Sequence, residues 1–564
     1  MGVLSDNTNS SSLSASGDFL KLDFNERSDK NNPLTSEYPF GDLLWQYPDR
    51  QPLEKKIADL NNLSSDQVLC TNGGDEAIMI LMRIIKEGTP LILPLPAFSQ
   101  YTWGVKSWKQ QAVLIDGQSN LAIDIDATLV AINNSKQSVT ILTRPNNPTG
   151  ESISIETLKT FLETAKKQSS WIFLDEAYIE FSDESSVASS LLNQYDNLVI
   201  LRTFSKAYGL AGIRLGYLMG AEALIEPFRE RCMPFNIPTP SLQIALRAMQ
   251  ESNQLEMKNY CQTIRENRQK ISSWLVSIGV KVFPSQANFL LLKLPTNQAK
   301  AVKSFLAKNR ILLRTFTEGE LIDCLRISIP YCIERLFDLL KQALQPQLIC
   351  LDMDGVLIDT SSSYDEATKA TVLQLSNNTI VQSQIDDLKR RGGYNNDWVL
   401  TKRLLDDLNC QFSLDEVTKV FQEIYVGKNN DGLMNNEVPL IQSALVSKIN
   451  QSTKTQFAVV TGRPYKEATI GKKLVNLNEL ELVSLDDVEL PKPSPEGIQK
   501  LQKRFSSSSW MCGDNLDDMQ AAVGSNSLAI GIGEENQDIL YQAGADIVLK
   551  SINDLEEWLC PINQ

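Results

Sequence analysis

The stretch RTFSKAYGLAGIRLGY, residues 202–217, decides how the first half of the chain is interpreted. It continues the apolar run LVILR (198–202) and then places Lys206 among small residues and glycines, with Arg214 eight positions later. A lysine chosen at random lies on a solvated surface in most proteins. Polar residues at the end of a buried strand occupy the edge where open α/β sheets bind ligands, so Lys206 is a candidate functional residue.

Similar apolar runs occur at VTILT (139–143) and WIFLD (171–175), and amphipathic stretches separate them. This alternation is typical of parallel strands that are buried by helices on both faces. It continues to about residue 345, so we expect an α/β domain over residues 18–345, after a flexible segment at 1–17.

The alternation starts again at QLICLDMDG (347–355), FAVVTG (457–462) and WMCGD (510–514), which predicts a second α/β domain over residues 346–564. Helix-forming residues dominate the stretch between the first two of these runs. We therefore expect a helical insert at about 360–455 in the second domain.

Composition restricts the classes of function. The 564 residues include 54 Lys and Arg against 69 Asp and Glu, a formal net charge of −15, which disfavours nucleic acid as a partner. The chain has no histidine, which excludes Ser-His-Asp and Cys-His catalysis and histidine-bound metals. Its 9 cysteines form no CxxC pair, which suits a reducing compartment.

The first 19 residues are polar and contain no apolar signal core, and no run approaches the roughly 18 apolar residues of a membrane span. We therefore expect a cytoplasmic protein that does not interact with membranes.

Polar residues follow several of the predicted strands of the first half. Gly73 and Gly74, in TNGGDEAIMILMRIIK (71–86), precede an amphipathic helix whose free N–H groups would favour a phosphate. Asp175 ends the WIFLD run, and a carboxylate at the tip of an apolar strand is costly unless a cation pairs with it. Each of these signals is weak when taken alone.

In this order, NGGDEA, PLPAFSQY, PNNPTG, DEAYIEF and FSKAYGLAGIRLGY resemble the motifs of fold-type I aminotransferases, most closely the histidinol-phosphate aminotransferase group. The resemblance covers roughly residues 18–345. It implies an enzyme with the PLP-dependent transferase fold, which has a mostly parallel sheet with helices on both faces and a small C-terminal subdomain. It also implies pyridoxal 5'-phosphate as cofactor, an amino acid and a 2-oxo acid as substrates, and a homodimer formed through this domain.

The resemblance assigns roles to the residues of the first half. Lys206 would form the Schiff base with the cofactor and move the proton at the substrate Cα, and Asp175 would keep the pyridine nitrogen protonated. Asn147 and Tyr178 would bind the ring hydroxyl, and Tyr101 would stack on the ring.

The remaining roles in this half concern phosphate and carboxylate groups. Four residues would bind the cofactor phosphate: Gly73, Gly74, Ser205 and Arg214. Tyr47 matches a tyrosine that reaches the neighbouring subunit's cofactor phosphate. Arg326 would take the substrate α-carboxylate. Arg314 matches an arginine that can contact a substrate phosphate, although a strand-end surface arginine remains an alternative interpretation.

In the second half, Asp352 and Asp354 follow an apolar strand two positions apart, and carboxylates this close repel unless a cation lies between them. Asp514 and Asp518 in CGDNLDD follow another apolar strand and can complete an oxygen-ligand Mg²⁺ site. Thr461 ends the FAVVT run, and Lys492 lies in LPKPSPEG.

This set resembles the four motifs of the haloacid dehalogenase superfamily over about residues 347–560, in the phosphoglycolate-phosphatase-like branch (subfamily IA). The resemblance implies a Rossmann-like α/β hydrolase with a helical cap that acts on small phosphorylated metabolites. Asp352 would attack phosphorus and form an aspartyl phosphate, and Asp354 would be the general acid and base. Thr461 and Lys492 would hold the phosphoryl oxygens. Mg²⁺ would be held by the four aspartates Asp352, Asp354, Asp514 and Asp518.

The polar, glycine-broken stretch RRGGYNNDW (390–398) lies in the expected cap. We expect it to point at the substrate, and an ordinary loop between cap helices is the alternative interpretation.

We therefore expect a bifunctional enzyme that combines transamination, with 2-oxoglutarate and glutamate as partners, and phosphomonoester hydrolysis. The two reactions would be consecutive steps of histidine biosynthesis. Three alternatives stay open: a lyase like the threonine-phosphate decarboxylases, a transaminase for another amino acid fused to an unrelated phosphatase, and a second half that acts only as a binding module.

Overall fold

The computed structural model describes residues 20–22, 25, 47–85, 88–184, 188–317, 319–391, 393–394, 396–429 and 431–559. The predicted N-terminal segment 1–17 lies outside these residues. The chain divides into two compact units: the first contains Met1–Lys293 and Arg310–Arg335, and the second contains Leu294–Asn309 and Leu336–Gln564.

The first unit contains a seven-stranded sheet in the order β2-β8-β7-β6-β5-β3-β4. Its strands are β2 (Val68–Thr71), β3 (Leu91–Pro94), β4 (Ala112–Ile115), β5 (Val139–Thr143), β6 (Trp171–Asp175), β7 (Leu198–Thr203) and β8 (Gly216–Gly220). Only β8 runs against its neighbours β2 and β7. Every residue of β5 and β7 is buried, so the expectation of a mostly parallel sheet covered on both faces is confirmed.

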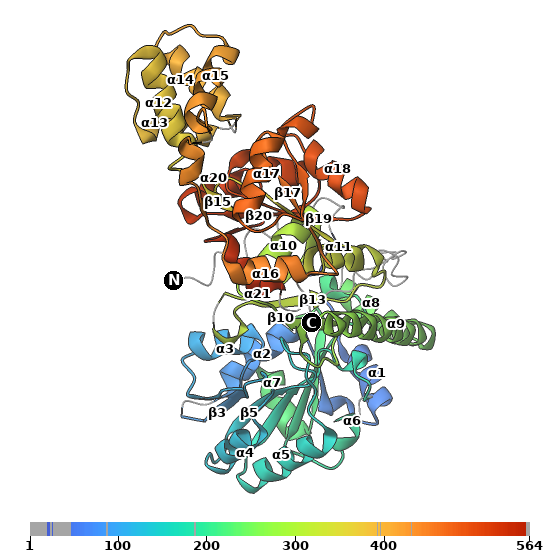
Figure 1. Cartoon of the computed structure of the whole chain (residues 1–564). Helices are drawn as coiled ribbons and strands as arrows, with labels where there is room; N and C mark the ends of the chain where they lie inside the picture. Colours follow the sequence, from blue (N-terminus) through green and yellow to red (C-terminus); the bar gives the residue numbers. More distant parts are fainter. Residues whose placement is uncertain are drawn as a thin grey trace. The chain divides into compact units, whose positions relative to one another are not determined.

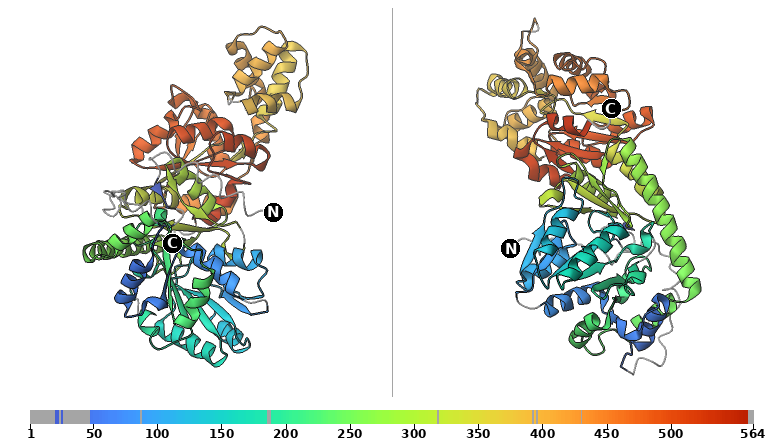
Figure 2. Two further views of the ribbon diagram at one scale, coloured as in Figure 1. Left: turned by 180° about the vertical axis from the view of Figure 1, so that it is seen from behind. Right: turned by 90° about the horizontal axis from the view of Figure 1, so that it is seen from below.

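Nine helices of the described part of the chain belong to the same unit (Figures 1 and 2): α1 (Gln51–Asn61), α2 (Gly73–Ile84), α3 (Ser99–Ser107), α4 (Ile125–Asn133), α5 (Ile155–Lys167), α6 (Ala188–Leu191), α7 (Glu222–Arg231), α8 (Thr239–Ala248) and α9 (Glu251–Ser277). Helix α5 shows how the sequence specifies these helices. Ser154 caps its first turn by accepting the N–H of Thr157, and Leu158, Phe161 and Leu162 are buried at helical spacing.

A small antiparallel sheet follows in the order β12-β13-β10-β9, which agrees with the expected C-terminal subdomain. Its strands are β9 (Lys281–Val282), β10 (Phe289–Lys293), β12 (Arg314–Thr315) and β13 (Cys324–Ser328). The short strands β1 (Leu20–Lys21) and β11 (Ile311–Leu312) pair separately in parallel.

The second unit contains a six-stranded, wholly parallel sheet in the order β18-β17-β14-β19-β20-β21. Its strands are β14 (Leu348–Leu351), β17 (Gln456–Val460), β18 (Glu481–Val483), β19 (Ser509–Gly513), β20 (Leu528–Ile532) and β21 (Ile547–Leu549). Its helices are α11 (Glu334–Leu344, which begins at the boundary), α16 (Ser443–Gln451), α17 (Tyr465–Leu474), α18 (Glu496–Phe505), α19 (Leu516–Gly524), α20 (Gln537–Gln542) and α21 (Leu555–Leu559). The expected Rossmann-like arrangement of the second half is confirmed.

A helical insert interrupts this sheet after β14. Its helices are α12 (Tyr364–Ser376), α13 (Gln382–Arg391), α14 (Asp397–Asp407) and α15 (Leu414–Tyr425), which Figure 1 shows as a separate group. The chain enters and leaves the insert through an antiparallel pair, β15 (Ile358–Asp359) and β16 (Val438–Pro439). Helix α16, which falls within the expected 360–455 stretch, packs against α21 instead.

Helix α10 (Gln298–Lys308) lies between β10 and β11 in sequence, yet it belongs to the second unit, where it packs against β20 and β21. The buried carboxylate of Asp546 fixes it by accepting from the Ser304 hydroxyl (2.8 Å) and pairing with the Lys308 ammonium (2.6 Å). The same carboxylate accepts the backbone N–H of Ala529 in β20 (2.9 Å).

We expect Asp546→Ala to lower the free energy of unfolding of the second unit by about 2–4 kcal/mol, because it leaves several donors without their acceptor. The Lys308 ammonium is partly exposed and can form hydrogen bonds with water in the variant, which limits the loss of stability to this range. Urea unfolding followed by circular dichroism measures the effect. Asp538→Ala, at an exposed position of α20, is the matched control. Equal unfolding curves for the two variants would contradict the expectation.

None of the helices in the described part of the chain combines the length and apolar character that crossing a membrane requires.

Candidate active sites

The first unit contains a cavity of about 780 Å³ at the carboxyl ends of its parallel strands. Side chains from β5, β6, β7 and the small sheet line it together, as open α/β sheets favour. Nine residues predicted from the sequence line it: Gly74, Asn147, Asp175, Tyr178, Ser205, Lys206, Arg214, Arg314 and Arg326.

Lys206 lies three residues beyond the end of β7. Its ammonium lies 5.6 Å from the centroid of the Tyr178 ring. The turn that carries it is fixed by the backbone N–H of Ser205, which donates to the Thr203 hydroxyl at 3.0 Å. The sequence therefore directs this lysine into the cavity.

Asp175 ends β6 and is 7% exposed. Its carboxylate accepts from the Tyr101 hydroxyl at 2.8 Å and from the Ala177 N–H at 3.0 Å. Burial raises the pKa of Asp175 to about 6, against the lowering effect of these two hydrogen bonds. A cation placed beside this carboxylate would favour its charged form, so the site fits a protonated heterocyclic nitrogen.

Asn147 and Tyr178 are linked by a long hydrogen bond from the Asn147 amide to the Tyr178 hydroxyl, at 3.4 Å. The Arg326 guanidinium donates to Asn147 Oδ1 at 2.6 Å. The Asn25 amide also donates to the Tyr178 hydroxyl, at 3.1 Å, and Asn25 lines the cavity. Sequence reasoning missed Asn25, because LDFNER (22–27) shows neither strand periodicity nor a glycine turn.

The N-terminus of α2 forms another wall of the cavity. Gly73 has φ +75°, and a Cβ added there would lie 2.7 Å from Arg214 Nη2. Arg214 itself has φ 49° and donates to the Asp75 carboxylate at 2.7 Å. Free helix N–H groups beside a guanidinium fit a phosphate.

Three predicted residues are not among those that line the cavity: Gly73, whose neighbour Gly74 does line it, Tyr101 and Tyr47. Tyr101 is fully buried behind Asp175, to which it donates, so ring stacking by this residue stays a prediction. Tyr47 is 80% exposed and stacks on Phe235, with ring centroids 4.5 Å apart.

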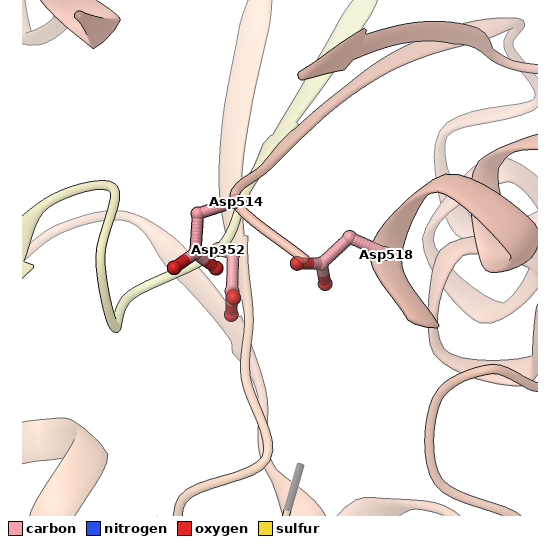
Figure 3. A group of neighbouring side chains, drawn as sticks. All are labelled: Asp352, Asp514 and Asp518. Carbon is pink, nitrogen blue, oxygen red and sulfur yellow. The ribbon is translucent and has the colours of Figure 1, made fainter. Parts of the chain in front are cut away.

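In the second unit, Asp352, Asp514 and Asp518 direct their carboxylates toward one another (Figure 3). One oxygen from each lies within 4.8 Å of the others. Asp352 and Asp514 follow the neighbouring strands β14 and β19, and Asp518 lies in the first turn of α19. Gly355 makes this approach possible: its φ is +68°, and a Cβ there would meet Asp514 Oδ2 at 1.9 Å.

Lys492 provides a positively charged side chain next to these three carboxylates. Its ammonium lies 2.8 Å from Asp352 Oδ1 and also pairs with Asp518. Burial, then the charge of Asp518, raise the pKa of Asp352 well above its usual range, and the same two causes raise the pKa of Asp514 to about 7. Three carboxylates against one ammonium fit a divalent cation with oxygen ligands.

Asp354, the fourth predicted metal ligand, lies outside this group of three. Its Oδ1 instead accepts a hydrogen bond from Arg463 Nε at 2.8 Å.

Thr461 and Lys492 line a smaller cavity of about 180 Å³ together with Gly393, Asn396 and Val399 of the insert. The Gly393 N–H points at the Asp517 carboxylate, 3.3 Å from each oxygen. The described part of the stretch 390–398 thus lies beside the predicted phosphoryl-binding residues.

Comparison with known proteins identifies a family for each half of the chain. Residues 43–340, more than half of the chain, match the model of the class I and II aminotransferases. Residues 349–532 match that of the haloacid dehalogenase-like hydrolases. The chain therefore belongs to the class I and II aminotransferase family and carries a C-terminal haloacid dehalogenase-like hydrolase domain.

Among its relatives, histidinol-phosphate aminotransferase 1 of Legionella pneumophila (strain Lens) is 33% identical over 49% of this chain and 76% of that protein. The "Putative histidine biosynthesis bifunctional protein HisCD" of Photorhabdus laumondii is 34% identical over 52% of this chain, which spans only 37% of that protein. The crystal structure of histidinol-phosphate aminotransferase from Sinorhizobium meliloti in complex with pyridoxal-5'-phosphate has the same fold, with a TM-score of 0.51 and 24% identity over 57% of this chain and 89% of that one. The particular group that the first half resembles is thus the histidinol-phosphate aminotransferases.

Proposed function

We propose that this chain is a bifunctional enzyme that transaminates histidinol phosphate with 2-oxoglutarate and hydrolyses a small phosphomonoester. The observation that supports the proposal is that each of the two units contains its own cluster of charged side chains at a predicted site. Lys206, Asp175 and Arg214 line one cavity, and Lys492 joins the carboxylate cluster of the other unit.

The first cavity fits pyridoxal phosphate. The cofactor, when bound, withdraws electrons from the substrate Cα through its ring. Asp175 would stabilise a proton on the ring nitrogen, and Asn147 and Tyr178 would bind the ring hydroxyl. Tyr101 positions Asp175, and its predicted stacking on the ring remains part of this proposal. Lys206 would hold the cofactor and move the proton at the substrate Cα.

Arginines account for the anionic groups of the ligands. Arg214, Ser205 and the N–H groups at Gly73 and Gly74 would bind the cofactor phosphate. Arg326 and Arg314 are paired residues of β13 and β12 that line the same cavity. They would take the substrate α-carboxylate and the substrate phosphate.

We expect Gly73→Ala to weaken cofactor binding by about tenfold or more, because the added Cβ would displace the Arg214 guanidinium that is predicted to bind the cofactor phosphate. Titration of the apoprotein with pyridoxal phosphate measures the affinity. Gly319→Ala is the matched control, because Gly319 has φ +66° but nothing within 4 Å of the added Cβ. Similar affinities for the two variants would mean that the Arg214 contact is unimportant.

In the second unit, Asp352 would attack phosphorus as the ester P–O bond breaks, and Asp354 would give its proton to the leaving alcohol. Asp354 would then take a proton from the water that hydrolyses the aspartyl phosphate. Thr461 and Lys492 would bind the phosphoryl oxygens. Asp352, Asp514 and Asp518, with Asp354 beside them, would hold Mg²⁺, which offsets negative charge on the phosphoryl group.

We further propose a cytoplasmic homodimer formed through the first unit. Tyr47, Met233 and Phe235 are 80%, 66% and 57% exposed, an apolar group that a second subunit could cover. Tyr47 would then reach the partner's cofactor phosphate. None of the eight described cysteines forms a disulfide, which suits a reducing compartment.

A coupled assay tests the proposed function. Purified protein with pyridoxal phosphate and Mg²⁺ is given histidinol phosphate and 2-oxoglutarate, and glutamate, imidazole acetol phosphate and inorganic phosphate are followed. Glutamate and phosphate together would support consecutive steps. Glutamate alone would keep the transaminase and assign the phosphatase to another ester. Release of CO₂ from threonine phosphate without an amino acceptor would replace the transaminase by a lyase.

A further inference from the structure

Arg463 is a buried charged residue beside the second site, with 1% of its side chain exposed. Its guanidinium binds two carboxylates at once. Nε donates to Asp354 Oδ1 at 2.8 Å, and Nη2 forms an ion pair with the same oxygen at 2.6 Å. On its other edge, Nη1 and Nη2 donate to the two oxygens of Glu437, at 3.0 and 3.1 Å.

The backbone around Arg463 is fixed as firmly as its side chain. Its N–H donates to the Thr461 hydroxyl at 3.1 Å, and its carbonyl accepts the Leu485 N–H at 3.0 Å. The guanidinium carbon lies 5.1 Å from the centroid of the Tyr364 ring. These contacts leave the guanidinium one orientation.

Glu437 is anchored at the base of the helical insert. It directly precedes β16, which pairs with β15, and these two strands carry the chain into and out of the insert. Glu437 Oε1 also accepts from the Tyr425 hydroxyl at 2.8 Å and the Ser363 hydroxyl at 3.0 Å. Its side chain is 2% exposed, so it cannot turn away from Arg463 without leaving buried donors unsatisfied.

Both contacts from Arg463 to Asp354 fall on Oδ1, and the Asp354 side chain is 32% exposed. The guanidinium therefore holds the carboxylate in one orientation and leaves Oδ2 for another partner. A proton donor acts efficiently only when its oxygen lies within hydrogen-bond reach of the leaving atom. A fixed orientation supplies that reach before the substrate binds.

We propose that Arg463, held by Glu437, is a positioning residue that aims Asp354 at the leaving-group oxygen. The proposal rests on the proposed phosphatase function. In the step concerned, the Asp352–phosphorus bond forms, the bond from phosphorus to the leaving oxygen breaks, and the Asp354 proton moves to that oxygen. Arg463 exchanges no proton and touches neither reacting atom.

The test compares two esters on the full-length protein with Mg²⁺. The nitrophenolate of p-nitrophenyl phosphate leaves with little protonation, whereas glycerol 2-phosphate releases an alkoxide that needs a proton. The constant kcat/KM covers the steps through formation of the phosphoenzyme. For Arg463→Ala we expect a loss of about 10²-fold or more with glycerol 2-phosphate, within the range of general acid catalysis, and a much smaller loss with p-nitrophenyl phosphate.

Three further variants separate positioning from folding. Arg463→Lys keeps the charge but cannot bind both carboxylates in a planar fork, so it should show the same ester dependence in weaker form. Glu437→Gln keeps the shape of the side chain and should also lose more with glycerol 2-phosphate. Arg504→Ala removes an exposed arginine of α18 and should leave both rates unchanged.

Equal losses with both esters would overturn the positioning role and leave a purely structural one. Unchanged rates in both Arg463 variants would overturn it as well. If the wild-type protein released phosphate from neither ester, the proposed phosphatase function itself would be wrong. That result differs from one in which the wild type is active and the variants lose the same factor in kcat/KM with both esters, which would refute only the positioning role.

Discussion

Replacing Lys206 by alanine is expected to lower the rate of transamination by a factor on the order of 10⁴ or more. Lys206 is the one lysine among the described residues that line the large cavity, so no neighbouring amine can take its place there. Release of glutamate from wild type and variant measures the effect. Borohydride reduction provides a second readout, because it should fix the cofactor on the wild-type peptide that contains residue 206 and not on the variant.

The matched control is Lys166→Ala, which removes a 53% exposed lysine of α5 that pairs with Asp196. It should retain wild-type transamination. Phosphate release by the Lys206 variant should also be retained, since the second site is built from another unit. A Lys206 variant that kept most of its transamination would refute the assigned role.

Asp352→Asn is expected to abolish phosphate release, with a loss on the order of 10⁴-fold or more, because a carboxamide is a poor nucleophile toward phosphorus. Asparagine has nearly the same size, so the packing around β14 should persist. Transamination should be unaffected. Initial rates of phosphate release from a phosphomonoester, measured over a series of Mg²⁺ concentrations, test the expectation.

The Mg²⁺ series distinguishes two causes of the loss. If Asp352 only held the metal, high Mg²⁺ would restore the rate, and the nucleophile would have to be another group. If Asp352 attacks phosphorus, no Mg²⁺ concentration restores it. Asp538→Asn, an exposed aspartate of α20, controls for the loss of one negative charge.

The strands of both sheets were predictable because their signal is local. VTILT and WIFLD in the first half and FAVVT in the second are apolar runs bounded by polar turns, and each lies on an observed strand. Residues at the ends of such strands converge because parallel strands share one carboxyl edge. That is why Lys206 and Asp175 could be placed together from sequence.

Contacts made by residues that do not lie at the ends of the predicted strands were not predictable. Glu437 and Arg463 meet across 26 residues, and Glu437 has no strand or glycine pattern that distinguishes it from a surface glutamate. Asn25 approaches Tyr178 from 153 residues away. The pairing of Arg214 with Asp75 depends on a left-handed backbone conformation at Arg214. An arginine in the sequence does not predict that conformation.

Helix α10 has a consequence for synthesis on the ribosome. Its buried face includes Ala301, Val302 and Phe305, and β20 and β21 of the same unit lie against it. Those strands are translated more than 200 residues after the helix. The apolar face of α10 therefore stays exposed on the nascent chain until nearly the whole polypeptide has been translated. If the first 345 residues were made alone, chaperones could bind this helix face, which is buried in the complete chain.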